Sequence, residues 1–363
     1  MKKPHSHSTG DSAASSAGGF LDTLAQIGTQ FSDTIAYSPE IVVNGSGTDL
    51  SDREALKGRV KRKTISQKLS LNLITVAEKN NDAGRAKAYW NTYYCQSEVI
   101  TANGRVYSKF CKNRFCLVCQ SIRKAQIINR YLPEIQTWED PHFVTLTVKS
   151  VTQAHLPGAL KDIHKYFQQI TGKHRKKDQR NKGEKLIGVK SLECNFNPVA
   201  QSYNPHLHAL VRNRAMAETL VKDWLEKWPS HVANRAAQDI QKTGNLETVL
   251  IEIVKYSSKI FVQPDMNTKG DSKIPRMVYA AALDHIFACL RKYRLFDRFG
   301  FNLPAEEKAK TESRINLEHC EKWLFHPALS DWYNEETGEV MSGFIRPPQL
   351  NFFLNQVIDT NLR

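Results

Sequence analysis

The sequence predicts an α+β fold in which an antiparallel sheet is covered by helices, and three strand-like segments carry that prediction. Residues 142–148 alternate apolar and polar side chains, with Val144 and Leu146 on one side, which is typical of a half-buried strand. Residues 186–194 and 206–211 form two further strand-like runs around a polar turn with two prolines. Helical periodicity separates and follows these strands, and this order favours helices packed on one face of an antiparallel sheet.

Helices are predicted where apolar residues recur at spacings of three and four. The helix after the first strand has such residues from Leu160 to Ile170 and is expected to end at Gly172, before a strongly basic loop at 173–185. The β-branched residues of the segment 246–260 leave a strand open there as an alternative. The further helices are expected at 220–228, 246–260 and 277–295.

Five regions are expected along the chain. The N-terminal region is rich in Ser, Gly, Ala and Thr, which is typical of a flexible tail. The basic run Arg59–Lys63 has two interpretations that the sequence leaves open, a solvated helix face or an arm that contacts phosphate. The regions are a disordered tail (1–50), a basic helical arm (51–90), a cysteine-rich module (91–130), the α+β domain (138–300) and a C-terminal extension (301–363).

Charge and the absence of long apolar runs narrow the class of protein. Lysine and arginine number 51 against 37 acidic residues, a formal net charge of +14, which favours a nucleic-acid partner over a role in solubility alone. Apolar runs fall well short of the ~20 residues that a membrane-spanning helix needs. The N-terminus has two lysines without an apolar run after them, so no secretory signal is expected. The cytoplasm is the expected location.

A pair of histidines separated by one leucine is the sharpest chemical signal. His206 and His208 lie two residues apart on a predicted strand, so both imidazoles face the same side and can hold one metal ion between them. The alternative is a pair of merely structural or exposed histidines on the polar face of a sheet. The proline-bounded turn before the pair and a suitable tyrosine after it favour the metal site.

That tyrosine is Tyr256. If the surrounding segment is helical, Tyr256 lies at the edge of the buried stripe, with Glu252 one turn before it and Lys259 one turn after it. A phenol in that position can face a site above the sheet. The alternative is a tyrosine that only covers the edge of the core.

Together these motifs resemble a known family. The runs 143–147, 206–208 and 252–259 are similar, in order, to the three motifs of rolling-circle replication initiators, in the plasmid branch with one tyrosine of the histidine-hydrophobic-histidine (HUH) endonuclease superfamily. The resemblance covers about residues 95–298. In this family branch the tyrosine follows the histidine pair, whereas conjugative relaxases usually have theirs before it.

The resemblance implies a metal-dependent nickase with a catalytic Mg²⁺ or Mn²⁺. His206 and His208 would be two ligands, and Glu193 in the preceding strand is the preferred third, with His142 as its competitor. The partner would be the double-strand origin of a plasmid, with a single-stranded nick site, together with host helicase and polymerase.

The resemblance also assigns the covalent chemistry. Tyr256 would attack the scissile phosphate, leaving a 5′-phosphotyrosine and a free 3′-hydroxyl that primes synthesis. Glu252 holds the place of the glutamate that activates water to end the round. Lys255 and Lys259 would lower the pKa of the phenol or hold phosphate.

Four cysteines form a second constellation. Cys95, Cys111, Cys116 and Cys119 lie close together in the sequence and include a Cys-x₂-Cys knuckle, which predicts a structural Zn²⁺ site. A redox pair at Cys116 and Cys119 is the alternative, although no thioredoxin-like context surrounds it. The module is expected either to recognise the origin or to be a zinc site with a solvated basic surface, because basic and aromatic residues interleave here: Lys109, Phe110, Lys112, Arg114, Phe115, Arg123 and Lys124.

Two other functions fit parts of the sequence. A non-enzymatic zinc-module DNA-binding regulator would explain the charge and the cysteines, but not the histidine pair and the tyrosine. A transposase or relaxase would use the same chemistry as a replication initiator.

Overall fold

The chain forms two units, which are described separately. A computed structural model describes residues 40–44, 47–255, 276–304, 312–316 and 320–357. The first unit comprises residues 1–46 with 310–320, and the second comprises 47–309 with 321–363. The described part of the first unit pairs β1 (Glu40–Asn44) with β10 (Glu312–Asn316) as antiparallel strands. The end of the predicted tail therefore forms a strand, and most of that tail lies outside the described residues.

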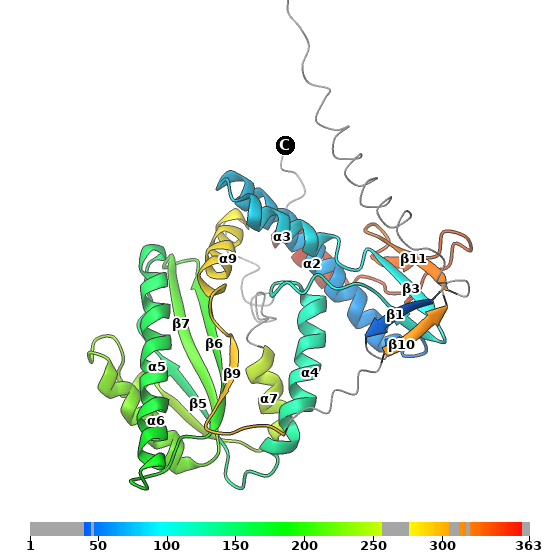
Figure 1. The fold of residues 1–363 in the computed structure, drawn as a ribbon. Coiled ribbons are helices and arrows are strands. Elements are labelled where there is room, and N and C mark those ends of the chain that lie inside the picture. The colour runs from blue at the N-terminus through cyan, green and yellow to red at the C-terminus, as the bar shows by residue number, and fades with distance from the viewer. Residues whose placement is uncertain (1–39, 45–46, 256–275, 305–311, 317–319, 358–363) are drawn as a thin grey trace, which may run out of the picture. The chain divides into compact units, whose positions relative to one another are not determined.

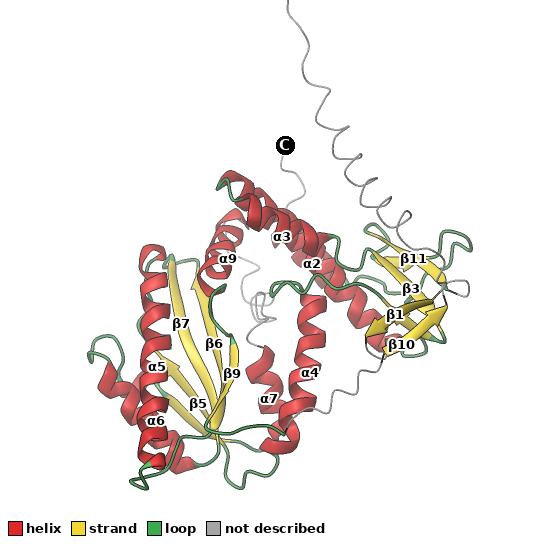
Figure 2. Cartoon of the chain, viewed as in Figure 1, coloured by secondary structure: helices red, strands yellow, loops and turns green. Residues whose placement is uncertain are grey.

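The sheet of the α+β domain has five antiparallel strands in the order β8-β5-β7-β6-β9. The three predicted strands form its centre, and two short edge strands, which the sequence analysis did not identify, complete it. These strands are β5 (His142–Thr147), β6 (Gly188–Asn197), β7 (Ser202–Val211), β8 (Asp239–Lys242) and β9 (Phe296–Phe299). The predicted α+β class is confirmed (Figure 2).

Two helices cover one face of this sheet, α5 (Leu156–Gln179) and α6 (Arg214–Lys227) (Figure 1). The prediction that the first of them ends at Gly172 is wrong, because the helix continues for seven residues to Gln179. Its last turns are held to α6 by Asp223, which accepts hydrogen bonds from Lys173 (3.0 Å) and the buried His174 (2.8 Å). Most of the basic segment expected as a loop is therefore helical.

The opposite face carries α4 (Leu117–Ile135) and α7 (Leu246–Lys255), so the sheet has helices on both faces rather than one (Figure 1). Tyr131 of α4 packs edge-on against Phe296 of β9, with ring centroids 5.1 Å apart. The helix α7 packs against α4 and contributes Leu250, Ile253 and Val254 to the core. Residues 246–255 are thus helical, and the alternative of a strand is excluded for them.

A second five-stranded sheet belongs to the cysteine-rich module, in the order β12-β11-β3-β4-β2. Its strands are β2 (Thr48–Asp49), β3 (Glu98–Ala102), β4 (Arg105–Tyr107), β11 (Glu321–His326) and β12 (Asp331–Tyr333). Residues expected only as a C-terminal extension therefore supply two of its strands. The fully buried Trp332 of β12 links these strands to the segment before β3, because its indole N–H donates to the carbonyl of Gln96 (2.8 Å).

The basic run Arg59–Lys63 lies in the long helix α2 (Arg53–Lys79), and its first and last residues are buried. Arg59 donates to the side chains of Gln96 (2.8 Å) and Ser108 (2.8 Å). Lys63 donates to the carbonyl of Tyr93 (2.7 Å). Burial lowers the pKa of Arg59 to about 10 and that of Lys63 to about 8. Neither residue has the solvated or phosphate-contacting role that the sequence left open.

The remaining helices connect these parts. The helix α3 (Ala83–Tyr93) packs on α2, as does α9 (Arg276–Leu290), which also contacts β6. Asp284 of α9 is buried and accepts from Arg85 (2.8 Å) and Tyr89 (2.7 Å) of α3. The other described helices are α10 (Pro348–Val357) and the 3₁₀ turns η1 (Gln153–His155) and η2 (Arg235–Ala237). None of the described helices combines the length and apolar character needed to cross a bilayer.

Candidate active site

Three potential metal ligands converge on the face of the sheet that carries α4 and α7. Glu193 of β6 lies directly opposite His206 of β7, and His208 follows two residues later on the same face. The Nε2 atoms of His206 and His208 lie 3.4 Å and 3.6 Å from the two carboxylate oxygens of Glu193. One ligand atom from each residue lies within 4.8 Å of the others, so the trio can surround one ion.

Hydrogen bonds on the far side of each imidazole fix its orientation. The Nδ1 atom of His206 lies 2.9 Å from the carbonyl of Asn204, and that of His208 lies 3.1 Å from the hydroxyl of Thr145. A carbonyl can only accept, so Nδ1 of His206 carries a proton, and Nε2 is the ring nitrogen that faces Glu193 and can bind a metal ion. Such outer contacts orient metal-binding histidines. The ring of Phe143 also stacks on that of His208, with centroids 5.2 Å apart.

Burial of the Glu193 carboxylate costs free energy that a bound cation would offset. Glu193, His206 and His208 are only 3%, 6% and 8% exposed. A carboxylate at that depth loses its hydration and needs a compensating positive charge. One carboxylate and two imidazoles can also bind a divalent metal ion, because imidazole is a ligand of transition metals and carboxylate is a ligand of Mg²⁺ and Mn²⁺. The chemistry of the residues therefore fits the divalent ion that the sequence predicts.

His142, the competing third ligand, lies on the other face of the sheet. Thr145 lies opposite His208 and therefore shares its face of the sheet. His142 precedes Thr145 by three residues in the same strand, and side chains an odd number of residues apart point to opposite faces. Its Nδ1 atom lies 2.8 Å from the carbonyl of Asp140. His142 is thus not brought together with the trio.

The structure describes the helix that leads to Tyr256 but not the tyrosine itself. Tyr256 and Lys259 lie outside the described residues, as does the side chain of Lys255. Glu252 is half-buried in the last turn of α7. Ser191 shares a face of β6 with Glu193, and Phe296 lies opposite Ser191 on that face. Phe296 contacts Tyr131 of α4, so α4 covers the face of Glu193, and α7 packs on α4. The helix before Tyr256 therefore lies on the histidine face.

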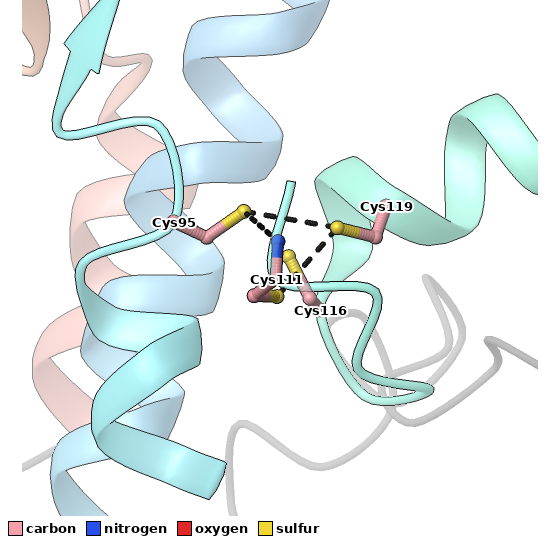
Figure 3. Close-up of side chains that lie close together, drawn as sticks. All are labelled: Cys95, Cys111, Cys116 and Cys119. Atoms are coloured by element: carbon pink, nitrogen blue, oxygen red, sulfur yellow. Dashed lines mark hydrogen bonds between the residues drawn. The ribbon is translucent and has the colours of Figure 1, made fainter. Parts of the chain in front are cut away.

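The four cysteines of the module converge (Figure 3). The Sγ atom of Cys119 lies 3.7 Å from that of Cys95 and 3.6 Å from that of Cys111, and all four sulfurs lie within 4.8 Å of one another. Cys116 is the N-cap residue of α4 and Cys119 lies in the first turn of this helix, where the helix dipole favours a thiolate. A shared hydrogen bond lowers the pKa of Cys111 and raises that of Cys116.

This geometry favours a four-thiolate metal site over a redox pair. A redox pair needs only two facing sulfurs, whereas here four sulfurs from three segments meet. Cys95 follows α3, and its sulfur accepts a hydrogen bond from the backbone N–H of Cys111 (3.5 Å). The sequence spacing of Cys95 departs from a pair of Cys-x₂-Cys knuckles. The structure nevertheless places Cys95 as a potential fourth ligand.

Some residues of the site were not identified from the sequence. Thr145, Asn204 and Phe143 orient or cover the histidines, and Ser191 donates to Glu193 (3.3 Å). Thr145 lies on the polar side of the alternating run at 142–148, so that alternation alone could have placed it beside the histidine face. Phe143 lies on the same side of that run, whereas Asn204 and Ser191 needed the register between strands.

Comparisons with known proteins identify replication proteins, as the three motifs predict. The family model described as "Replication protein" (Rep_1) matches residues 105–269, a span that contains the histidine pair and Tyr256. A protein of Staphylococcus aureus named "Protein rep" is 30% identical over 167 residues, which are 41% of this chain and 69% of that protein. A "Protein rep" of Streptococcus pneumoniae serotype 2 (strain D39 / NCTC 7466) is 33% identical over 173 residues, covering 41% and 51%.

No solved structure matches the chain significantly. The similarity to the Staphylococcus aureus protein spans more than two thirds of that relative. The family match contains the three motifs at 143–147, 206–208 and 252–259. The resemblance to replication initiators is confirmed, and the chain belongs to the Rep_1 family of replication proteins.

Proposed function

We propose that this protein initiates rolling-circle replication of a plasmid by nicking one strand of its double-strand origin. The observation that carries the proposal is the convergence of Glu193, His206 and His208 on one sheet face, beneath the helix α7, whose described part reaches Lys255. Membership of the Rep_1 family supports the role in replication.

The buried trio would hold Mg²⁺ or Mn²⁺, with Nε2 of each histidine and the Glu193 carboxylate as ligands. When bound, the ion would polarise a non-bridging oxygen of the scissile phosphate and stabilise the charge that develops there. The hydrogen bonds of Asn204 and Thr145 hold the two rings in the required orientation before the DNA arrives.

Tyr256 is the proposed nucleophile. Its phenol loses a proton, its oxygen bonds to phosphorus, and the bond from phosphorus to the 3′ oxygen of the preceding nucleotide breaks. That oxygen takes up a proton to become the free 3′-hydroxyl primer, while the 5′ phosphate stays on the tyrosine. Lys255 and Lys259 would hold phosphate or favour the phenolate. Reversal of the same step by a 3′-hydroxyl rejoins strands at the end of a round.

Glu252 is proposed to end the round by deprotonating water. It lies one helical turn before Tyr256 in sequence, and α7 is helical through Lys255. A water activated there would attack the phosphotyrosine phosphorus and free the tyrosine. This role needs the carboxylate only after nicking.

The cysteine cluster is proposed to hold a structural Zn²⁺ that fixes the module, and the module is proposed to contact the origin. The remaining assignments follow from the proposed activity. A host polymerase would extend the free 3′-hydroxyl while a host helicase separates the strands, and the cytoplasm would be the compartment.

A nicking assay tests the proposal. Wild-type protein with Mg²⁺ or Mn²⁺ is expected to convert a supercoiled plasmid that carries its origin to the open circle, and excess chelator is expected to stop this conversion. The Glu252→Ala variant should still nick and form the covalent adduct, but accumulate it instead of releasing it. Origin binding without any nicking, at every metal tested, would instead support the DNA-binding regulator.

A further inference from the structure

A cavity of about 290 Å³ opens beside the proposed catalytic metal site. Its walls come from α3, from the loop between Cys111 and Cys116, from β6 and from α9. Glu193 belongs both to this wall and to the Glu193–His206–His208 trio. Glu193 therefore connects the cavity to the trio, while its neighbours Leu192 and Cys194 line the cavity from the other face of β6.

Aromatic rings form one side of the cavity. Phe115 of the cysteine loop lies between Tyr89 of α3 and Phe287 of α9, with ring centroids 4.7 Å and 5.2 Å away. Tyr89 is fully buried and its hydroxyl donates to Asp284 (2.7 Å), so it acts as a support. Phe115 and Phe287 are only half-buried and both line the cavity, which leaves ring surface available for stacking.

Aliphatic side chains and several cations form the rest of the lining. Lys112 and Arg291 are exposed and can reach phosphate near the opening. Arg114 instead fixes the loop, because its guanidinium donates to the carbonyls of Leu290 (3.1 Å) and Tyr293 (2.7 Å). Rings flanked by cations are the combination that binds unpaired nucleotides.

The cysteine loop is held firmly enough to act as a wall. Its two ends are Cys111 and Cys116 of the sulfur cluster. Within it, the amide of Asn113 donates to the carbonyl of Ala88 in α3 (2.7 Å). The loop therefore connects the cysteine cluster to α3 and α9 through defined contacts.

We propose that this cavity receives one unpaired base of the origin strand. The inference rests on the proposed nicking function and names the part of the substrate that the cysteine module would read. A volume near the lower limit of about 300 Å³ for small-ligand pockets suits one base and excludes a base pair. Stacking on the accessible surface of Phe115 and Phe287, whose rings already touch each other, would hold the base out of the duplex, as in other enzymes that act on extruded nucleotides.

A thermodynamic cycle tests the inference with single-stranded oligonucleotides that tile the origin strand. The tightest-binding oligonucleotide is remade with one abasic position at a time, and affinity is measured without divalent metal so that no cleavage occurs. We expect one position at which loss of the base weakens binding to the wild-type protein by about 5- to 100-fold. Equal affinities at all positions would overturn the proposal.

The protein side of the cycle uses Ala288→Trp, which fills the cavity from an exposed position on α9. This variant should bind the intact oligonucleotide more weakly by a similar factor and lose the sensitivity at that one abasic position. Ala281→Trp is the matched control, because Ala281 is also exposed on α9 but does not line the cavity. Phe115→Leu, which removes a ring without adding bulk, should also reduce the abasic effect.

The possible outcomes separate this inference from the proposed function. If Ala288→Trp and the wild type lose the same factor at every abasic position, the base does not occupy the cavity. If the cycle shows coupling but the wild-type protein never nicks its origin, the cavity assignment stands and the nickase proposal fails. Unchanged melting temperature and metal content of the variants confirm that they fold.

Discussion

Replacing His206 or His208 by alanine is expected to reduce origin nicking by about 10²- to 10³-fold or more, while origin binding survives. Each substitution removes one of two Nε2 ligands that face the Glu193 carboxylate. Metal-binding energy and phosphate orientation are then lost together, because the remaining pair cannot enclose the ion. Glu193→Gln should have a comparable effect, since the amide keeps the shape but loses the charge that attracts the cation.

The measurement is the initial rate of plasmid nicking at saturating protein, with binding followed separately in a gel-shift assay. His231→Ala is the matched control, because His231 is exposed and lies outside the trio. Its nicking rate should equal that of the wild type. A His206→Ala or His208→Ala protein that nicks at the wild-type rate would remove the trio from the mechanism.

Replacing Cys111 by serine is expected to abolish zinc binding and to destabilise the module. The sulfur of Cys111 lies 3.6 Å from that of Cys119 in the cluster, and a structural zinc contributes about 10–16 kcal/mol of apparent binding energy to folding. The loop that ends at Cys116 should lose its fixed position, together with the link from Cys95 into β3. Elemental analysis should fall from one zinc per chain to none, and the thermal unfolding midpoint should drop.

Cys320→Ser is the control for this experiment, because Cys320 lies outside the cluster. It should retain both the zinc and the unfolding midpoint of the wild type. Wild-type protein that contains no zinc after purification without chelator would contradict the assignment. Zinc that persists in Cys111→Ser would instead exclude Cys111 as a ligand.

The parts of the fold that could be predicted are those in which local pattern and burial agree. Residues 142–147 and 206–211 alternate along strands that have one apolar face against α5 and α6, so their period of two was visible. The same alternation placed His206 and His208 on one face. Glu193 was predicted as their neighbour from the family resemblance, and the register of β6 with β7 now brings the three together.

The parts that could not be predicted depend on partners that are distant in sequence. The strand β11 pairs Lys322 with Ile100, and nothing in the local composition of either segment identifies that partner. The helix α5 continues past Gly172 because His174 and Lys173 meet Asp223 of another helix. Tertiary contacts of this kind override a local stop signal.

Charged residues were the other source of error. Arg59 and Lys63 belong to a basic run that by composition predicts a solvent-facing or phosphate-binding surface. In the structure their head groups are buried and bind polar atoms of the cysteine module. Long basic side chains can be buried when such partners exist, and a sequence does not display those partners.

The central claim is that Tyr256 attacks the scissile phosphate, and mapping the covalent adduct tests it most directly. The chain has 12 tyrosines, and trypsin can cut after Lys255 and Lys259 to release a peptide in which Tyr256 is the only one. Protein incubated with the cleaved origin strand and Mg²⁺ or Mn²⁺ should carry the nucleotide on that peptide, and Tyr256→Phe should form no adduct while still binding the origin. An adduct on another tyrosine, or nicking by Tyr256→Phe at the wild-type rate, would contradict the account.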